Sequence, residues 1–570
     1  MKLQKKYAIA LLIVSISGIV SWSLLQGPAG PVKPIDQLMP EGALLYIEAK
    51  DFSGLLKDWN TSPEKAQWIK SDSYRVFSNS RLFLRLNKAS EEFAKAAGVP
   101  PDTKFLNDAA GRESALGIYD IGKLEFLYIG RLSSGFAQSP LWQSRSKFEF
   151  RTAAGKTFFT RKEEESGRVV AFAVVDNYVV LGTREDLVAG ALELLGASQA
   201  RPLAREEWYA QAVAAAGTNS GDLRIVMHME KIAVTPHFRT YWLQQNITEM
   251  QGYASAVSDL YREGADYREE RVILPRKQMD DDAAITEQAQ AVTSLLRSIP
   301  TDYGFYEAGA TNPKLSLAAV TGKILTPRAS GSTTEKVAPQ VQLGGGETGA
   351  ASDLESRIDV EPASRTGNEN ALAQLQKDFE RAQPQAMLVV QGTRKNSDNV
   401  LLNIPSTVVL SASADWDFSG VQKSIQDAVA PGVTASRLGL QWRDLKDAGG
   451  YSEFDGLMPV AIAVRGKLLY IANDAGMLAS ILQSNNAPPK NPVSYIARFS
   501  HSRERQNFYR LTTLSDQNTG APQNEPPFFS HNIASFSRSF AKIDSEEVVI
   551  RQSKDRIQQT VTYRWAQSPK

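Results

Sequence analysis

The chain of 570 residues contains no cysteine. This absence excludes disulfides, thiolate nucleophiles, cysteine-based zinc sites and the lipidated cysteine of a bacterial lipoprotein. An excess of either charge is also missing, because 64 Lys and Arg residues stand against 63 Asp and Glu residues. We therefore expect no nucleic-acid partner, since nucleic-acid binding needs a basic footprint.

Recognised catalytic and metal-binding motifs are missing as well. The sequence has no nucleophile elbow, zinc-protease helix, dinucleotide fingerprint or calcium loop. Ala154–Thr157 ends like a phosphate-binding loop but lacks its first glycine, so a hairpin turn is predicted there. We predict no catalytic residue, no metal and no cofactor, and hence a protein that is not an enzyme. None of the four histidines has the spacing of a metal site: His228, His237, His501 and His531.

The N-terminus has the features of an export signal. Lys2, Lys5 and Lys6 precede the uncharged run 7–25, and Gly27–Pro31 follows it. A helix over this run rises ~1.5 Å per residue and reaches about the ~30 Å thickness of a bilayer core. We predict a single transmembrane helix in the bacterial inner membrane, with the remaining chain extracytoplasmic. The alternative is cleavage near Ala29 and secretion to the periplasm.

The remaining chain predicts an α+β fold, with antiparallel or mixed sheets, packed helices and two related modules. The boundaries follow from composition and repeats. We expect a signal anchor at 1–30, a first module at 31–210, a connecting region of helices and strands at 211–325, a flexible low-complexity linker at 326–369, and a second module with a C-terminal helix and hairpin at 370–570.

Two sequence units recur in these modules. In the first, a strand leads into a helix at Asp51–Gly54 and again at Asp417–Gly420, where the aspartate suits an N-cap. In the second, a hairpin leads into a helix, from Ala171 with a turn at Asp176 and Asn177, and from Ala461 with a turn at Gly466 and Lys467. The first of these helices is expected to begin at Thr183 with Asp186. A third opening at Pro300 is too weak to count as a repeat.

Between the modules, apolar spacing predicts amphipathic helices over 243–261 and 285–296. A further helix over 528–540 and a closing hairpin around Lys554 and Asp555 are predicted near the C-terminus. One segment mixes aromatic and hydrogen-bonding side chains at a helix start, which suits an interface as well as an ordinary docked helix. Its candidate interaction residues are His237, Arg239, Tyr241, Trp242, Gln245 and Asn246.

The Pro40 opening, Asp51–Gly54, the hairpin and helix from Ala171, and the ending Phe528–Ser535 resemble a family of bacterial envelope proteins of unknown function. The resemblance implies an architecture and an extracytoplasmic setting, but it carries no active site.

The sequence favours a membrane-tethered binding or scaffold protein of the cell envelope. Its partners would be the inner membrane, through residues 7–25, and another envelope protein or envelope component. Two alternatives stay open: a carboxylate-based hydrolase with a cleft between the modules, and a carrier of an apolar ligand between two sheets.

Overall fold

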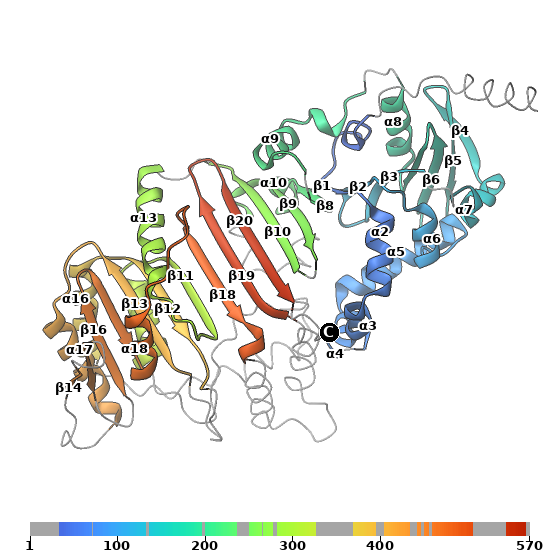
Figure 1. The fold of residues 1–570 in the computed structure, drawn as a ribbon. Helices are drawn as coiled ribbons and strands as arrows, with labels where there is room; N and C mark the ends of the chain where they lie inside the picture. Colours follow the sequence, from blue (N-terminus) through green and yellow to red (C-terminus); the bar gives the residue numbers. More distant parts are fainter. Residues whose placement is uncertain are drawn as a thin grey trace, which may run out of the picture.

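The computed structural model contains one continuous sheet of 20 strands, in which every neighbouring pair is antiparallel (Figure 1). This confirms the α+β prediction and selects an antiparallel over a mixed sheet. The structure describes residues 33–565 except 71, 133–135, 197–199, 220, 236–249, 265, 278–281, 326–368, 395–403, 434–441, 446–449, 455–458 and 505–542.

The sheet consists of two halves of ten strands each, which are called modules from here on; the first extends beyond the module expected at 31–210, and the second begins before the one expected at 370–570, so both take strands from the connecting region 211–325. The first comprises β1 (Leu45–Ala49), β2 (Ser114–Asp120), β3 (Glu125–Arg131), β4 (Glu149–Ala153), β5 (Lys156–Lys162), β6 (Val169–Val175), β7 (Tyr178–Gly182), β8 (Leu223–Met227), β9 (Tyr253–Glu263) and β10 (Asp266–Pro275). The second comprises β11 (Phe305–Ala310), β12 (Pro384–Gln391), β13 (Ser406–Ala412), β14 (Trp442–Leu445), β15 (Tyr451–Phe454), β16 (Val460–Arg465), β17 (Leu468–Ala472), β18 (Tyr495–Ser500), β19 (Ile543–Gln552) and β20 (Ile557–Trp565).

The two modules have the same strand order. From the outer edge inward the first runs β4-β5-β6-β7-β3-β2-β1-β8-β9-β10, and the second runs β14-β15-β16-β17-β13-β12-β11-β18-β19-β20. Adding ten to a strand number therefore gives its equivalent. The modules join where β10 pairs with β20, and the pair Glu270–Thr560 lies on a pseudo-two-fold axis. The chain is an internal duplication fused edge to edge.

Residue numbers follow the same duplication. β7 and β17 begin at Tyr178 and Leu468, and β9 and β19 begin at Tyr253 and Ile543, an offset of 290 positions in both cases. The repeated hairpin and helix found in the sequence are therefore true equivalents. The predicted turn is confirmed, because Asp176 and Asn177 have positive φ values of 50° and 67°.

The other sequence repeat, at Asp51–Gly54 and Asp417–Gly420, does not mark equivalent positions in the two modules. Asp51 follows β1, whereas Asp417 follows β13, the counterpart of β3. Both aspartates do cap helices, accepting hydrogen bonds at 3.0 Å from the amides of Gly54 and Gly420. A shared cap motif therefore reflects a local hydrogen bond and does not identify equivalent elements of the fold. The segment at Pro300, dismissed as too weak, opens β11 and so corresponds to the Pro40 opening of β1.

Helices cover both faces of each module (Figure 1). In the first module the core between the sheet and α8 is separate from the core beneath α5 and α6. In the second, α13 and α18 cover one face, and α14, α16 and α17 cover the other. The helix bounds are α2 (Phe52–Thr61), α3 (Pro63–Ile69), α4 (Asp72–Ser78), α5 (Arg81–Ala97), α6 (Thr103–Ala109), α7 (Pro140–Gln143), α8 (Glu185–Leu195), α9 (Glu207–Ala216), α10 (Met229–Ile232), α13 (Asp282–Leu295), α14 (Pro313–Val320), α16 (Glu369–Ala382), α17 (Phe418–Val433) and α18 (Ala475–Gln483).

Two local predictions are wrong. The helix expected over 243–261 is a strand from Tyr253 onward, because pairing with β8 and β10 on both sides outweighs a helical spacing of apolar residues. Thr183 does not cap α8. Its hydroxyl instead accepts a hydrogen bond at 2.9 Å from the Phe126 amide in the neighbouring strand.

Other expectations concern residues outside the description. They are the transmembrane helix at 7–25, nearly all of the linker at 326–369, and the helix at 528–540. No helix among the described residues is both long enough and apolar enough to span a bilayer.

Candidate functional site

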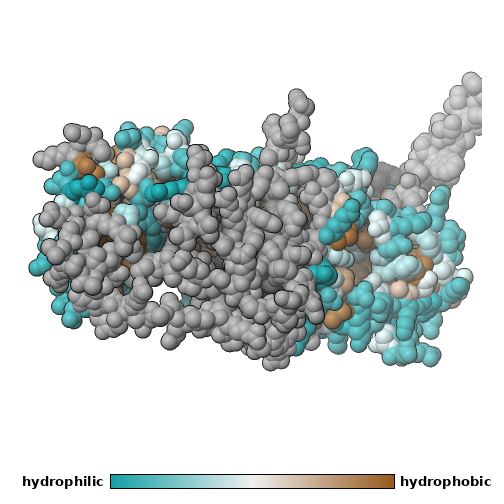
Figure 2. Space-filling model, turned by 90° about the horizontal axis from the view of Figure 1, so that it is seen from below, coloured by the Kyte–Doolittle hydropathy of each residue, from teal (hydrophilic) through white to brown (hydrophobic). Residues whose placement is uncertain are grey.

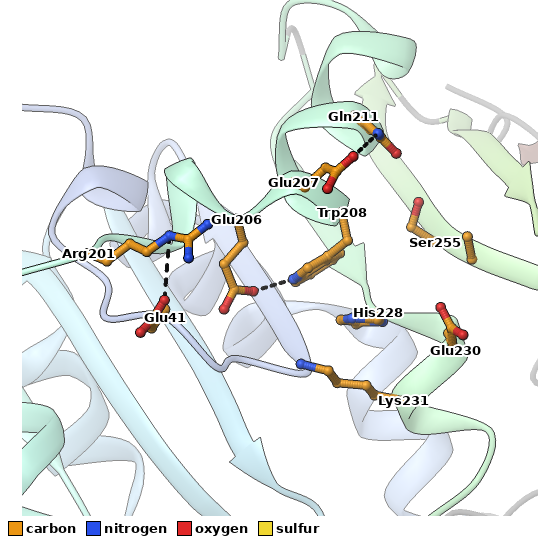
Figure 3. A pocket seen from close by; sticks show the side chains of 11 residues that line it. Glu41, Arg201, Glu206, Glu207, Trp208, Gln211, His228, Glu230, Lys231 and Ser255 are labelled. Carbon is orange, nitrogen blue, oxygen red and sulfur yellow. Dashed lines mark hydrogen bonds and ion pairs between the residues drawn. The ribbon is translucent and has the colours of Figure 1, made fainter.

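A cleft of about 390 Å³ opens on the first module (Figure 3). It lies where four segments meet: the loop before β1, the start of α9, the short helix α10, and the beginning of β9. Polar side chains dominate the lining, which is Glu41, Arg201, Glu206, Glu207, Trp208, Gln211, His228, Glu230, Lys231, Ala254 and Ser255.

Backbone hydrogen bonds fix the position of His228. Its amide donates to the Leu44 carbonyl at 2.9 Å, just before β1 begins, and its carbonyl accepts from the Ile232 amide at 2.9 Å. His228 therefore sits on the tight turn between β8 and α10. It lies just past the C-terminal end of β8.

A stacked pair of rings forms the centre of the cleft. The Trp208 and His228 ring centroids are 4.5 Å apart, with the ring planes inclined at 34°. The Trp208 indole N–H donates to Glu206, whose other carboxylate oxygen accepts from the Gly42 amide at 2.7 Å. Glu206 thereby ties the start of α9 to the loop before β1 and holds the indole over the imidazole (Figure 3).

The other carboxylates of the cleft also have partners. Glu41 pairs with Arg201 at 3.6 Å, and Glu207 accepts from Gln211 at 3.0 Å. Glu230 pairs at 2.8 Å with Arg276, which lies just beyond β10. Each of these carboxylates thus has a hydrogen-bond or ion-pair partner at the surface.

Two polar side chains of the cleft each lack an expected partner among the described residues. Lys231 makes no ion pair with any of them, and the buried Nδ1 of His228 has no hydrogen-bond partner among them. Burial lowers the pKa of the His228 imidazole, and the nearby Lys231 lowers it further. The ring is thus neutral at pH 7, and the positive charge offered to a ligand is the Lys231 ammonium.

A buried polar cluster adjoins the cleft through α9, where Trp208 lines the cleft and the next residue, Tyr209, packs edge-on against Tyr46 at 5.6 Å. Arg224 of β8 and Asp259 of β9 form a two-pronged ion pair there, with N–O distances of 2.7 and 2.6 Å. Both side chains are almost fully buried.

Burial also changes proton affinities in this cluster. It raises the pKa of the carboxyl groups of Asp36 and Glu48 above their usual values. Charge buried at this density is uncommon in a domain core, and such departures concentrate at functional sites.

The candidate interaction residues from the sequence, His237, Arg239, Tyr241, Trp242, Gln245 and Asn246, lie outside the described residues. That segment stays a prediction. The predicted turn at Ala154–Thr157 is confirmed: Ala154 and Gly155 connect β4 to β5 with positive φ. Within the described part of the chain, no group of side chains could hold a metal ion.

Sequence reasoning missed the cleft. Trp208 and Glu206 carry no motif, and His228 lies 20 positions from Trp208. The insertion that builds the cleft becomes visible only when the paired strands of the two modules are compared. β7 and β17 begin 290 positions apart in the sequence. Arg224 of β8 pairs with Asp259, and Ile496 of β18 pairs with Val549, which is the equivalent of Asp259. Arg224 and Ile496 are therefore equivalent residues, but they are only 272 positions apart. The connection between β7 and β8 is therefore 18 residues longer than its counterpart, and it contains α9.

Comparisons with known proteins give few matches. No protein-family model matches the chain, and no curated protein matches it. Among solved structures, crystal forms I and III of TP0453 are similar, each with a TM-score of 0.24. They share 11% and 13% identical residues, and the matches cover 46% of this chain and 86% and 87% of theirs.

Proposed function

We propose that this chain is a non-enzymatic binding and scaffold protein of the bacterial cell envelope, tethered by residues 7–25 and carrying its binding site on the first module. The continuous sheet supports the scaffold role, because the antiparallel β10–β20 pairing holds both modules in one body. The export signal and the resemblance to envelope proteins support the location.

The observation that carries the binding role is the cleft on α9. This helix is an addition that the second module lacks between α18 and β18. It places an indole over a neutral imidazole beside a lysine without an ion-pair partner among the described residues. Such a surface fits a carboxylate or another anionic group attached to a flat or apolar moiety of an envelope partner.

Site-specific photo-crosslinking in intact cells tests this role. A photoreactive phenylalanine in place of the exposed Gln211 on the cleft should capture a defined product. The same residue in place of Gln376, exposed on α16 of the second module, should not. Lys231→Glu should weaken the Gln211 product, because it reverses the charge offered to the ligand. Equal capture at both positions, unaffected by Lys231→Glu, would contradict the proposal.

A hydrolase panel separates binding from catalysis. Purified protein should show no turnover, and turnover abolished by His228→Gln or Glu206→Gln would show that the cleft is catalytic. The alternative of a hydrolase site between the modules receives no specific support. At the junction, Glu269 and Glu270 are ion-paired with Arg271 and Arg268. The carrier alternative assumed two sheets, whereas the described strands form one sheet whose module faces are filled by helices.

A further inference from the structure

A helical arm projects from the first module. We define the arm as residues 52–88, which include α2, α3, α4 and the first half of α5. None of its described side chains is fully buried. Its interior is a small set of aromatic rings in edge-on or tilted contact, with centroid distances from 5.4 to 6.3 Å. These rings are Trp68, Tyr74, Phe77 and Phe83.

Large apolar side chains lie on the outside of this arm. The exposed fraction is 51% for Trp59, 49% for Ile69, 56% for Leu84 and 43% for Leu86. Most of the remaining large apolar residues with comparable exposure are scattered singly over other elements. Figure 2 shows the molecule from the side toward which α3 and α4 point in Figure 1, and brown apolar residues are interspersed with teal polar ones among the coloured residues of that face. Four exposed apolar residues on one small arm mark an interaction surface.

The charge of the arm indicates its partner. The sequence 52–88 has seven basic residues and three acidic ones, a net charge of +4 in a chain whose total is +1. On α5 the exposed residues Arg81, Leu84 and Lys88 follow i, i+3, i+7 spacing, so a leucine lies between two cations on one helical stripe. Lys57 and Lys70 are exposed next to Asp58 and Ile69, and Asp58 is already paired with Arg262.

We propose that the arm docks on the surface of an anionic lipid bilayer, with Trp59, Ile69 and Leu84 entering the headgroup region and the lysines contacting lipid phosphates. Helices with basic and apolar faces bind at this depth, and tryptophan favours the interface. This contact is separate from the N-terminal segment. Lys33 donates to the carbonyl of Leu194 in α8, whereas α5 packs on the opposite face of the same sheet.

The absence of cysteine makes a direct test practical. In the full-length chain, Leu84→Cys on the arm and Leu315→Cys on α14, which is 53% exposed, each provide one labelling site for a polarity-sensitive fluorophore. Both proteins are mixed with phosphatidylcholine vesicles, with and without phosphatidylglycerol. We expect the emission of the Leu84 label to shift to the blue only when phosphatidylglycerol is present, and the Leu315 label to stay unchanged.

A charge variant completes the test. Combining Lys57→Glu, Lys70→Glu and Lys88→Glu should weaken the phosphatidylglycerol-dependent binding by roughly a hundredfold or more, since each basic residue near an anionic surface contributes about fivefold. Circular dichroism of each variant checks that the fold is retained. The proposal is overturned if the Leu84 label stays in water with phosphatidylglycerol vesicles, or if its shift is the same with phosphatidylcholine alone. Neither result would affect the crosslinking test of the cleft.

Discussion

Each module has an ion pair on the same face of the sheet, but the two pairs lie in different cross-strand rows. In the first module, the cross-strand row Glu48–Arg224–Asp259 is charged, and the next row on that face is Tyr46–Val226–Val257. In the second module the equivalent of the charged row is apolar, and the equivalent of the tyrosine row carries the charges. These rows are Ala308–Ile496–Val549 and Tyr306–Arg498–Glu547.

The difference in burial follows from the helices. The side chains of Arg224 and Asp259 are 4% and 7% exposed, because α9 packs over β8 and β9. Arg498 and Glu547 are 25% and 24% exposed, with an N–O distance of 3.6 Å, and no helix separates α18 from β18. The comparison shows that α9 creates both the cleft and the buried ion pair beside it. The first module therefore carries the specialised site.

The largest expected effect comes from breaking the buried pair. Asp259→Ala should cost about 3–5 kcal/mol of unfolding free energy, because it leaves the Arg224 guanidinium buried without its partner. Glu547→Ala, the matched change in the second module, should cost at most ~1 kcal/mol, since solvent screens that pair. Urea denaturation of each variant measures both values. Similar losses would show that burial does not separate the two pairs.

A double substitution that copies the second module into the first tests the same comparison of the two ion pairs. Arg224→Ile combined with Asp259→Val places the apolar pair of the second module in the first. We expect this double variant to recover most of the loss caused by Asp259→Ala, because well-packed apolar pairs replace buried ion pairs at little cost. A double variant as unstable as the single one would show that the guanidinium and carboxylate contribute beyond their mutual pairing.

The equivalent tyrosines should respond with opposite signs. Tyr46 is fully buried beside two valines, and its hydroxyl has no hydrogen-bond partner among the described residues. Tyr46→Phe should therefore stabilise the protein by up to ~1 kcal/mol. Tyr306 lies opposite Arg498 in the sheet, where its hydroxyl interacts with the guanidinium, so Tyr306→Phe should destabilise the protein by about 1 kcal/mol. Thermal unfolding of both variants checks the signs, and a loss in both would contradict the assignment of an unpaired hydroxyl.

Asp36 should contribute to the pH dependence of stability, because burial raises the pKa of its carboxyl group. A carboxyl group with a raised pKa in the folded state loses its stabilising contribution as pH rises through that value. Asp36→Asn, which stays neutral, should therefore be more stable than the unmodified protein at pH 7. This advantage should vanish below pH ~4, near the pKa of an unfolded aspartate. Unfolding curves across this range test it, and a constant difference at all pH values would contradict the burial argument.

The smallest expected effects concern the two caps. Asp51→Ala and Asp417→Ala should each cost about 0.5–1 kcal/mol, because each removes an exposed hydrogen bond to a helix amide. Similar costs are expected despite their different positions in the modules, since the second contact of each aspartate, with the Ser53 hydroxyl or the Arg381 guanidinium, is also exposed to solvent. A large difference would show that one cap also holds tertiary structure.

Local signals predicted the hairpins well. The turns at Asp176 and Gly466 have positive φ, and the hairpin around Lys554 is formed as expected. The prediction failed where distant strands decide the structure. The helical spacing of its apolar residues predicts a helix at β9, and only the pairing with β8 and β10 makes this segment a strand. The candidate cleft was out of reach for the same reason, because α9 and α10 meet only after the sheet has formed.

The junction between β10 and β20 has a consequence for assembly. A symmetric dimer separates on dilution, and its two halves must share one sequence. Here the equivalent contact is intramolecular, so the two halves stay paired at any concentration, and each has been free to change alone. Among the described residues, the α9 cleft and the arm each occur in one module alone, so the proposed partner would bind one copy per chain, whereas a homodimer of identical halves would offer two.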